Sequence, residues 1–486
     1  MSPRDRLGWL VDALVGDREN LDLTAGGIGK PLFFLSFPIV VTNLLQTAYN
    51  LADTFWLGQY STEALAAISF GFPMVFLLIS LGMGLSVAGS VTVAQYVGAG
   101  REAEAEYAAS QTVSLSIVAA LALGLVGYAG VEFLLGLLGA EGAVLEQAAS
   151  YLEVISLGLV FMFGFFVFIS LMRGYGDTVT PMLVMFGSVA VNVALDPFLI
   201  FGWGPFPELG IQGAAVATVV ARAGALAVGL WLMFTGTRGV RIRLSQMRPD
   251  PGYAAKLLRI GVPASVEGTG RALSVNLMLV IVGTFPTTVV AAFGIGVRVF
   301  SVVFMPAIAV ARGVETMTGQ NLGADKPDRA AAAANFAARV MFVLLSLLGV
   351  VAWVYGEAIV GLFTPDPAVV EVGTGFLVYV APTFGMLGIM RAYNGSLRGA
   401  GLTLVAAVIS ITTLGVVRLP VAWFGAGWLG ADGIWLSFAV SNVFGAVLAF
   451  LWYRRGTWRD ADVTDRGPDV LDDEGEGEGE PVAADD

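Results

Sequence analysis

Residues 93–100, with the sequence VAQYVGAG, return 225 positions later as residues 318–325, with the sequence TGQNLGAD. The same offset places Pro38 on Pro263. It also aligns two arginine-glycine pairs, Arg173-Gly174 and Arg398-Gly399. Near the end of each half the offset drifts to 220, where Leu209-Gly210 matches Leu429-Gly430. Because one offset recurs over about 140 residues, the chain is a duplicated unit, and repeats in an apolar chain are typical of transporters.

The composition indicates a membrane protein. Of the 486 residues, 56% are hydrophobic and only 13% are charged, with a mean hydropathy of +0.78. A soluble domain carries about 25% charged residues, so this chain cannot cover a water-facing surface of its size. Apolar segments long enough to cross a bilayer as helices recur at 32–57, 64–92, 107–130, 148–172, 179–202, 209–234, 256–283, 289–317, 331–354, 373–396, 401–424 and 431–453. We therefore predict an all-α polytopic protein with twelve transmembrane helices, six in each repeat.

The distribution of basic residues predicts the topology. An even number of spans per repeat means that both halves enter the membrane from the same side, so the repeats are parallel. The central loop is basic, and the loops on that side also hold Arg101, Arg173, Lys326 and Arg398, whereas the alternate loops contain no Lys or Arg. The positive-inside rule then places both termini in the cytoplasm and the chain in the cell membrane. We expect a cytoplasmic arm at 1–30, lobes at 31–240 and 241–456, and an acidic disordered cytoplasmic tail at 457–486.

Several chemistries are excluded by residue counts. The chain contains no cysteine and no histidine, which removes disulfides and imidazole metal sites. It has no pair of GxGD motifs and no DDxxD motif of the kind found in membrane-embedded enzymes, so we expect that it is not an enzyme. The net charge is −12, with three lysines against 23 arginines, a balance that suggests the salt-loaded cytoplasm of a halophile.

Polar residues inside the predicted spans are the candidate functional residues, because ionisable groups in a bilayer are costly. On the first span, Asn43, Gln46, Asn50 and Asp53 share one helical face, and Tyr49 lies beside it. The fifth span repeats the pattern with Ser188, Asn192 and Asp196. Asp53 and Asp196 could bind a cation such as Na⁺ through oxygens, or exchange a proton. The alternatives are that Asp53 caps the end of its span, and that Asp196 marks a bend at Pro197.

The repeat favours a coupling role in the first half. When the two repeats are aligned at the common offset, Asp53 aligns with Met278 and Asp196 aligns with Val421. Residues needed only for the fold would resemble one another in the two copies. The second half has its own charges, Glu267 with Arg271 and Arg312 with Glu315, spaced for ion pairs within a helix, and also Arg298. These form either a structural network or a substrate-facing or gating cluster. Arg222 and Arg418 have no assigned role.

These features together resemble the multidrug and toxic compound extrusion (MATE) family over residues 30–455. The resemblance is carried by Gln95 to Gly100, Gln320 to Asp328, Arg173 to Thr178, Arg398 to Gly401 and Asn50 to Gly58. Within the family the chain looks most like archaeal members of the DNA-damage-inducible F branch. The resemblance implies two six-helix lobes in a V. It also implies a cation or proton site formed by Tyr49, Asp53, Asn192, Asp196 and Thr218, with Pro38 as a hinge.

The resemblance further implies alternating access, in which amphipathic cationic organic compounds leave the cell in exchange for H⁺ or Na⁺. It implies no cofactor, and as partners only small organic molecules and the lipid bilayer. We expect no nucleic acid partner and a monomer. The alternative from the same superfamily is a flippase for lipids or lipid-linked oligosaccharides.

Overall fold

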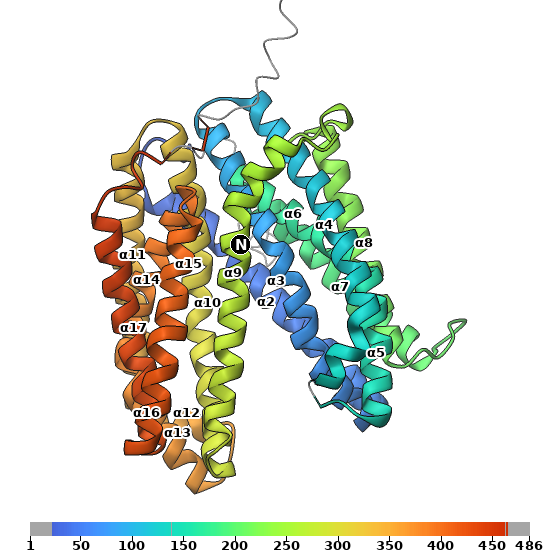
Figure 1. Ribbon diagram of the computed structural model, residues 1–486, viewed down its shortest axis with the longest axis vertical. Coiled ribbons are helices and arrows are strands. Elements are labelled where there is room, and N and C mark those ends of the chain that lie inside the picture. Colours follow the sequence, from blue (N-terminus) through green and yellow to red (C-terminus); the bar gives the residue numbers. More distant parts are fainter. Residues whose placement is uncertain (1–21, 138, 462, 465–486) are drawn as a thin grey trace, which may run out of the picture.

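The computed structural model describes residues 22–137, 139–461 and 463–464, and within these ranges the chain is helical and forms no strand (Figure 1). The predicted arm and acidic tail lie mostly outside the described residues, so those two predictions stay open. The first half contains α2 (Gly29–Tyr60), α3 (Thr62–Gly98), α4 (Glu102–Leu137), α5 (Gly142–Leu157), α6 (Leu159–Tyr175), α7 (Val179–Phe201) and α8 (Ile211–Thr235). We call these helices the N-lobe.

The second half, the C-lobe, mirrors this order with more interruptions. Its elements are α9 (Pro251–Val282), α10 (Thr287–Gly323), α11 (Pro327–Val354), α12 (Gly356–Gly361), α13 (Pro367–Val380), α14 (Phe384–Gly399), α15 (Thr403–Ile411), α16 (Leu419–Leu429) and α17 (Ala431–Arg454). A 3₁₀ turn, η2 (Ala381–Thr383), joins α13 to α14, and a π-helical segment, η3 (Thr412–Arg418), joins α15 to α16. Pro382 and Pro420 lie at these breaks, where each removes a backbone donor.

Eleven helical spans among the described residues are long and apolar enough to cross a membrane, and a twelfth is a bent pair. The predicted span at 148–172 is two helices, α5 and α6, which meet at 56°. The bend falls at Gly158, where α8 packs so closely that a Cβ would lie 2.2 Å from the Val219 side chain. The prediction of twelve spans is confirmed, with this one broken by a glycine that permits the close approach.

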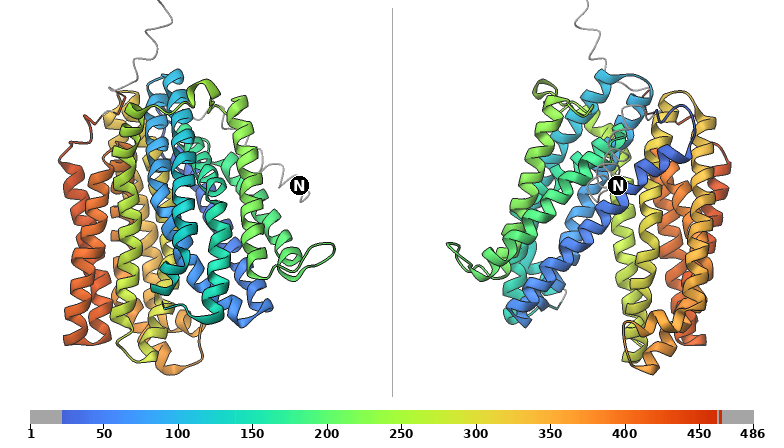
Figure 2. Two further views of the ribbon diagram at one scale, coloured as in Figure 1. Left: turned by 45° about the vertical axis from the view of Figure 1, so that its right-hand side comes forward. Right: turned by 180° about the vertical axis from the view of Figure 1, so that it is seen from behind.

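The lobes touch at one end of the molecule and diverge toward the other (Figures 1 and 2). We call the end with loops 99–101, 176–178, 324–326 and 400–402 the closed end, and the opposite end the far end. Contacts between the lobes run from α3 to α9 and α10, and from α2 to α10. At one of them, a Cβ on Gly84 of α3 would lie 2.0 Å from the carbonyl oxygen of Gly261 on α9. The predicted V of two lobes is confirmed.

The repeated octets, residues 93–100 and 318–325, form the lobe contact at the closed end. A Cβ on Gly98 would lie 2.0 Å from the carbonyl oxygen of Gln320, and a Cβ on Gly323 would lie 1.9 Å from that of Gln95. The side chain of Gln95 donates to the carbonyl of Gly399 at 3.1 Å, while Gln320 donates to that of Gly174 at 3.0 Å. Each repeat therefore supplies a glycine for a close backbone approach and a glutamine that bonds the helix end of the other lobe.

We expect Gly98→Val to open the closed end. The added side chain overlaps the Gln320 backbone, and such overpacking costs about 1–3 kcal/mol in a state that requires the contact. The chain has no cysteine, so Ser36→Cys supplies a single thiol, buried where α2 contacts Gly313 of α10. Maleimide should label this thiol about tenfold faster in the Gly98→Val background.

The control for this labelling experiment is Gly187→Val, because a Cβ at Gly187 meets no atom within 4 Å. It makes the same change on an exposed face of α7. Equal labelling rates for Gly98→Val and Gly187→Val would show that the glycine contact does not hold the closed end together.

The segment between the lobes is anchored to the N-lobe. Asp250 caps the start of α9, accepting from the backbone N–H of Gly252 at 2.7 Å and of Tyr253 at 3.2 Å. The Tyr107 hydroxyl of α4 also donates to Asp250, at 2.8 Å, and this bond holds the pKa of the carboxyl below its ordinary value. The first helix of the C-lobe is thereby fixed to α4 by a charge-assisted bond.

Candidate functional site

The two N-lobe carboxylates are fully buried within their helices. Asp53 lies on α2, seven residues before its last residue, and Asp196 lies on α7; both have 0% of their surface exposed. Asp53 therefore does not cap the end of its span. Asp196 accepts a hydrogen bond from the Asn192 side-chain amide, one turn earlier, at 3.2 Å. α2 and α7 pack against each other, and the two carboxylates lie within electrostatic range of one another.

Four buried oxygen atoms of this site have no hydrogen-bond donor among the described residues. They are both carboxylate oxygens of Asp53, Oδ2 of Asp196 and Oδ1 of Asn192. Unpaired acceptors in an apolar interior are costly, and an ionised carboxylate there is more so. A proton on one carboxyl would make it a donor to its neighbour, and a small cation could take several of these oxygens as ligands. The donor set therefore fits either H⁺ or Na⁺.

Tyr49 and Thr218, which the family resemblance assigns to this site, contact each other. Their hydroxyl groups hydrogen-bond each other, joining α2 to α8, and both residues are buried. Tyr151 of α5, which the sequence analysis did not select, is also buried, within electrostatic range of Asp53 and Asp196. Its only sequence signal is a hydroxyl-bearing ring inside an apolar span, which is too common to identify a site.

Arg222 of α8 brings a fixed positive charge to the site. It is 2% exposed, and its guanidinium donates to the side-chain oxygen of Gln46 at 2.8 Å. It also stacks over the ring of Tyr49, 4.9 Å from the centroid, and lies within electrostatic range of Asp53. The site thus contains two carboxylates, Asp53 and Asp196, and one guanidinium. One added proton or monovalent cation would therefore bring the formal charge of the site to zero.

The residues of the predicted polar stripe differ in their exposure. On α2, Gln46 donates to Asn50 at 3.1 Å; Asn50 is exposed and Asn43 is half-buried, so these residues remain accessible. Ser188 differs from the prediction of a cavity-lining residue. It is 5% exposed and its hydroxyl donates to the backbone carbonyl of Ala221 at 3.2 Å. The reason is that α7 packs directly on α8 at this position, a contact that periodicity along one helix cannot reveal.

The predicted hinge residue, Pro38, lies inside a helix that continues through it. A proline cannot bond the carbonyl four residues earlier, here that of Phe34. Thr178 of the repeated motif donates to this carbonyl at 3.3 Å. Its repeat partner Thr403 donates, at 2.7 Å, to the carbonyl three residues before Pro263. In the first repeat the threonine therefore supplies a donor to the carbonyl that the proline leaves free, whereas in the second repeat it donates to the carbonyl one residue later.

The C-lobe charges form a network around Arg398. The predicted pairs within helices are present, with Arg271 3.3 Å from Glu267 and Arg312 2.9 Å from Glu315. Arg398 of α14 joins them, 3.1 Å from Glu267 and 3.3 Å from Glu315. The Ser410 hydroxyl of α15 also donates to Glu267 at 2.8 Å. The sequence analysis did not place Arg398 in this network.

Three arginines lie differently from their predictions. Arg173 and Arg398 were expected among the basic loop residues, but they are 8% and 6% exposed. They belong to the last turns of α6 and α14, whose ends turn the side chains inward to the glutamates. Arg298 was expected in the C-lobe network. It is exposed, forms no ion pair with a described residue, and lies four helical turns from Arg312, about 21 Å along α10.

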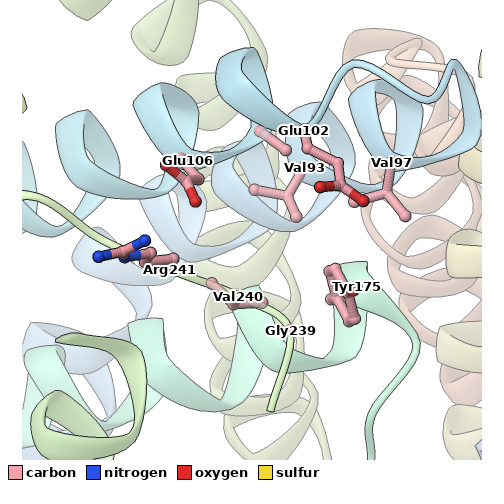
Figure 3. A pocket seen from close by; sticks show the side chains of 9 residues that line it. Val93, Val97, Glu102, Glu106, Tyr175, Gly239, Val240 and Arg241 are labelled. Carbon is pink, nitrogen blue, oxygen red and sulfur yellow. The ribbon is translucent and has the colours of Figure 1, made fainter. Parts of the chain in front are cut away.

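A small cavity of about 30 Å³ lies within the N-lobe near the closed end (Figure 3). Tyr175, Glu102 and Val240 line it, with side chains from α4 and α6 facing the connector segment. This volume is enough for about one water molecule and not for an organic substrate. A larger groove of about 340 Å³ lies on the outer side of α11, α14 and α17 and is lined mainly by apolar side chains. Neither belongs to the carboxylate site.

Two six-span lobes joined at one end, with buried unpaired carboxylates in one of them, define a multi-pass membrane transporter. The chain belongs to the MatE family, whose model matches residues 38–198 and 263–424. Members of this family are transporters and not enzymes. The two matched segments begin at Pro38 and Pro263, which are 225 positions apart, so the match also reproduces the duplication.

Two related transport proteins align with nearly the whole chain. A FAD transporter from Shewanella oneidensis is 29% identical over 438 residues, which span 90% of this chain and 97% of that protein. The probable multidrug resistance protein NorM from Thermotoga maritima is 28% identical over 437 residues, spanning 89% and 93%.

Solved structures share the fold. The MATE transporter VcmN of Vibrio cholerae in the bent form aligns with a TM-score of 0.81 and 26% identity, covering 88% of this chain and 96% of that one. A multidrug resistance MATE family transporter in an outward-facing conformation aligns with a TM-score of 0.82 and 24% identity, covering 89% and 97%. At 24% identity, the alignment with the outward-facing transporter shows that the fold is shared and nothing more.

Proposed function

We propose that this protein is a secondary active antiporter that exports amphipathic organic compounds in exchange for H⁺ or Na⁺. The observation that carries the proposal is the buried pair Asp53 and Asp196, whose oxygens lack donors among the described residues. Such a pair is costly unless a cation or proton joins it, which makes cation entry a source of free energy. The multidrug resistance relatives support an organic substrate.

The mechanism follows from differential binding. The N-lobe site binds a cation or proton on the far side, and the resulting loss of charge changes how α2 and α7 pack. A cation can drive the transition only if it binds one conformation more tightly than the other. Here α2 carries both Asp53 and the contact with α10, so that a change at the carboxylates reaches the lobe contact through one helix.

Finer assignments belong to this proposal as well. The pairing of Tyr49 and Asp53 on one helix with Asn192 and Asp196 on another supports membership of the DNA-damage-inducible F branch; the two relatives described above come from bacteria. The basic loops at the closed end support a cytoplasmic position for that end and for both termini. The substrate then leaves through the far end, where the lobes diverge. We propose that the protein works as a monomer in the cell membrane.

The experiment that tests the proposal is ethidium export from proteoliposomes under imposed ΔpH or ΔpNa, each applied alone with the membrane potential clamped. Export driven by one gradient and not by the other establishes an antiporter and identifies its ion. Export that proceeds equally without a gradient overturns the proposal. Lipid scrambling or flipping in the same vesicles, without any movement of dye, would favour the flippase alternative instead.

A further inference from the structure

Arginines exceed carboxylates in a group of mostly buried charges formed by the C-lobe and the end of α6. The Arg398 network belongs to a larger group of charged side chains that interact electrostatically across α6, α9, α10 and α14. The group consists of five arginines and two glutamates, Arg173, Arg271, Arg312, Arg391, Arg398, Glu267 and Glu315. Its formal charge is therefore +3. A net charge of this size within a membrane-spanning lobe needs a compensating partner.

Arg391 is the member that forms no ion pair with a described residue, although Glu267 lies within electrostatic range of it. It is 5% exposed and has neither an ion pair nor a hydrogen bond with a described residue. Its guanidinium lies over the ring of Phe304, 4.4 Å from the centroid, which leaves its in-plane N–H groups free. The Nε atoms of Arg173 and Arg271 are also buried without an acceptor. Unused donors from several buried arginines favour a ligand that brings oxygen acceptors.

The cluster can be reached from between the lobes. Arg271 and Arg312 keep 34% and 18% of their side chains exposed. They lie on α9 and α10, the two C-lobe helices that contact the N-lobe through α3 and α2. Phe304 and Phe300, stacked at 5.9 Å on α10, provide an aromatic surface next to Arg391. A compound that enters the interlobe space would therefore meet positive charge beside an aromatic surface.

We propose that the C-lobe arginine cluster binds an oxyanion of the transported compound, a carboxylate or a phosphate, so that the substrate is an amphipathic organic anion. This inference rests on the proposed export function and reverses the charge of the cationic substrate expected from the family resemblance. An organic cation would be repelled by the excess of three positive charges, whereas a planar oxyanion can accept two parallel bonds from one guanidinium.

Binding of fluorescent probes to the purified full-length protein in lipid nanodiscs tests the proposal. Riboflavin and FMN share one ring system and differ by a phosphate, while fluorescein brings a carboxylate and ethidium a positive charge. FMN, fluorescein or both should bind, and riboflavin and ethidium should bind at least about tenfold more weakly, because they lack the oxyanion that accepts hydrogen bonds from the charged guanidinium groups. FMN and fluorescein separate phosphate recognition from carboxylate recognition.

Variants assign the binding to the cluster. Arg391→Gln should raise the Kd of the anion about tenfold or more, and Arg391→Lys should restore part of the affinity. Arg271→Gln is a second variant, at a partly exposed position, in case Arg391→Gln does not fold. The matched control is Arg339→Gln, which removes an exposed arginine of the outer groove that has no ion pair with a described residue.

The outcomes separate this inference from the export proposal. If neither FMN nor fluorescein binds, or if Arg391→Gln and Arg339→Gln bind the anion equally, the inference is wrong even if ethidium is exported under a gradient. If the anions bind in the expected order but neither a ΔpH nor a ΔpNa drives transport of the bound anion or of ethidium, the arginine site stands and the antiport proposal is wrong.

Discussion

Asp53→Asn is expected to reduce gradient-driven export to the rate of protein-free liposomes. Asparagine has nearly the same shape as aspartate but can neither take up a proton nor present a charge to a cation. In this variant the formal charges of Asp196 and Arg222 sum to zero, so the N-lobe site no longer gains from an added proton or cation and the gradient cannot bias the transition. The measurement is the initial rate of export under the ion gradient that drives the wild type.

The loss should not come from misfolding. Both oxygens of Asp53 lack donors among the described residues, so neutralising the group removes a buried unpaired charge. We therefore expect Asp53→Asn to unfold at the same temperature as the wild type or at a higher one. Asp432→Asn makes the same chemical change at an exposed position in the first turn of α17 and should transport normally. Export by Asp53→Asn at the wild-type rate would show that coupling occurs elsewhere.

Arg398→Ala is expected to destabilise the protein by about 3–5 kcal/mol, the usual cost of removing one partner from a buried ion pair. Among the residues that the structure describes, Arg398 alone forms ion pairs with both Glu267 and Glu315, and its side chain is 7% exposed. Without it each glutamate keeps a single arginine, and the ion pairs that join α14 to Glu267 on α9 and to Glu315 on α10 are lost. Denaturant-induced unfolding of the two proteins in the same detergent measures the difference.

Arg298→Ala is the matched control for this measurement, because Arg298 lies in the same lobe, is exposed and forms no ion pair with a described residue. Its free energy of unfolding should lie within about 0.5 kcal/mol of the wild type. If Arg398→Ala unfolds as easily as this control and no more, the network around Arg398 does not stabilise the C-lobe.

Local patterns in the sequence were sufficient for the architecture. The 225-residue offset, the apolar segments and the spacing of polar residues predict two six-span repeats and place Asp53 and Asp196 inside their spans. These features depend on the helical period and on the thickness of a bilayer, both of which act within one segment. The ion pairs of Glu267 with Arg271 and of Arg312 with Glu315 were predictable for the same reason, since they lie within a helical turn.

Only the tertiary structure decided which charges meet. Arg398 lies 131 residues from Glu267, Arg222 lies 176 residues from Gln46, and the sequence signal of each is one arginine in an apolar segment. The burial of Ser188 against Ala221 and the break at Gly158 depend likewise on how closely one helix packs on another. The sequence by itself determined how many times the chain spans the membrane and which residues each span presents along its length. Packing between helices decided which polar groups find a partner and which, like the oxygens of Asp53, are left without one, because burial and pairing are properties of neighbours distant in the chain.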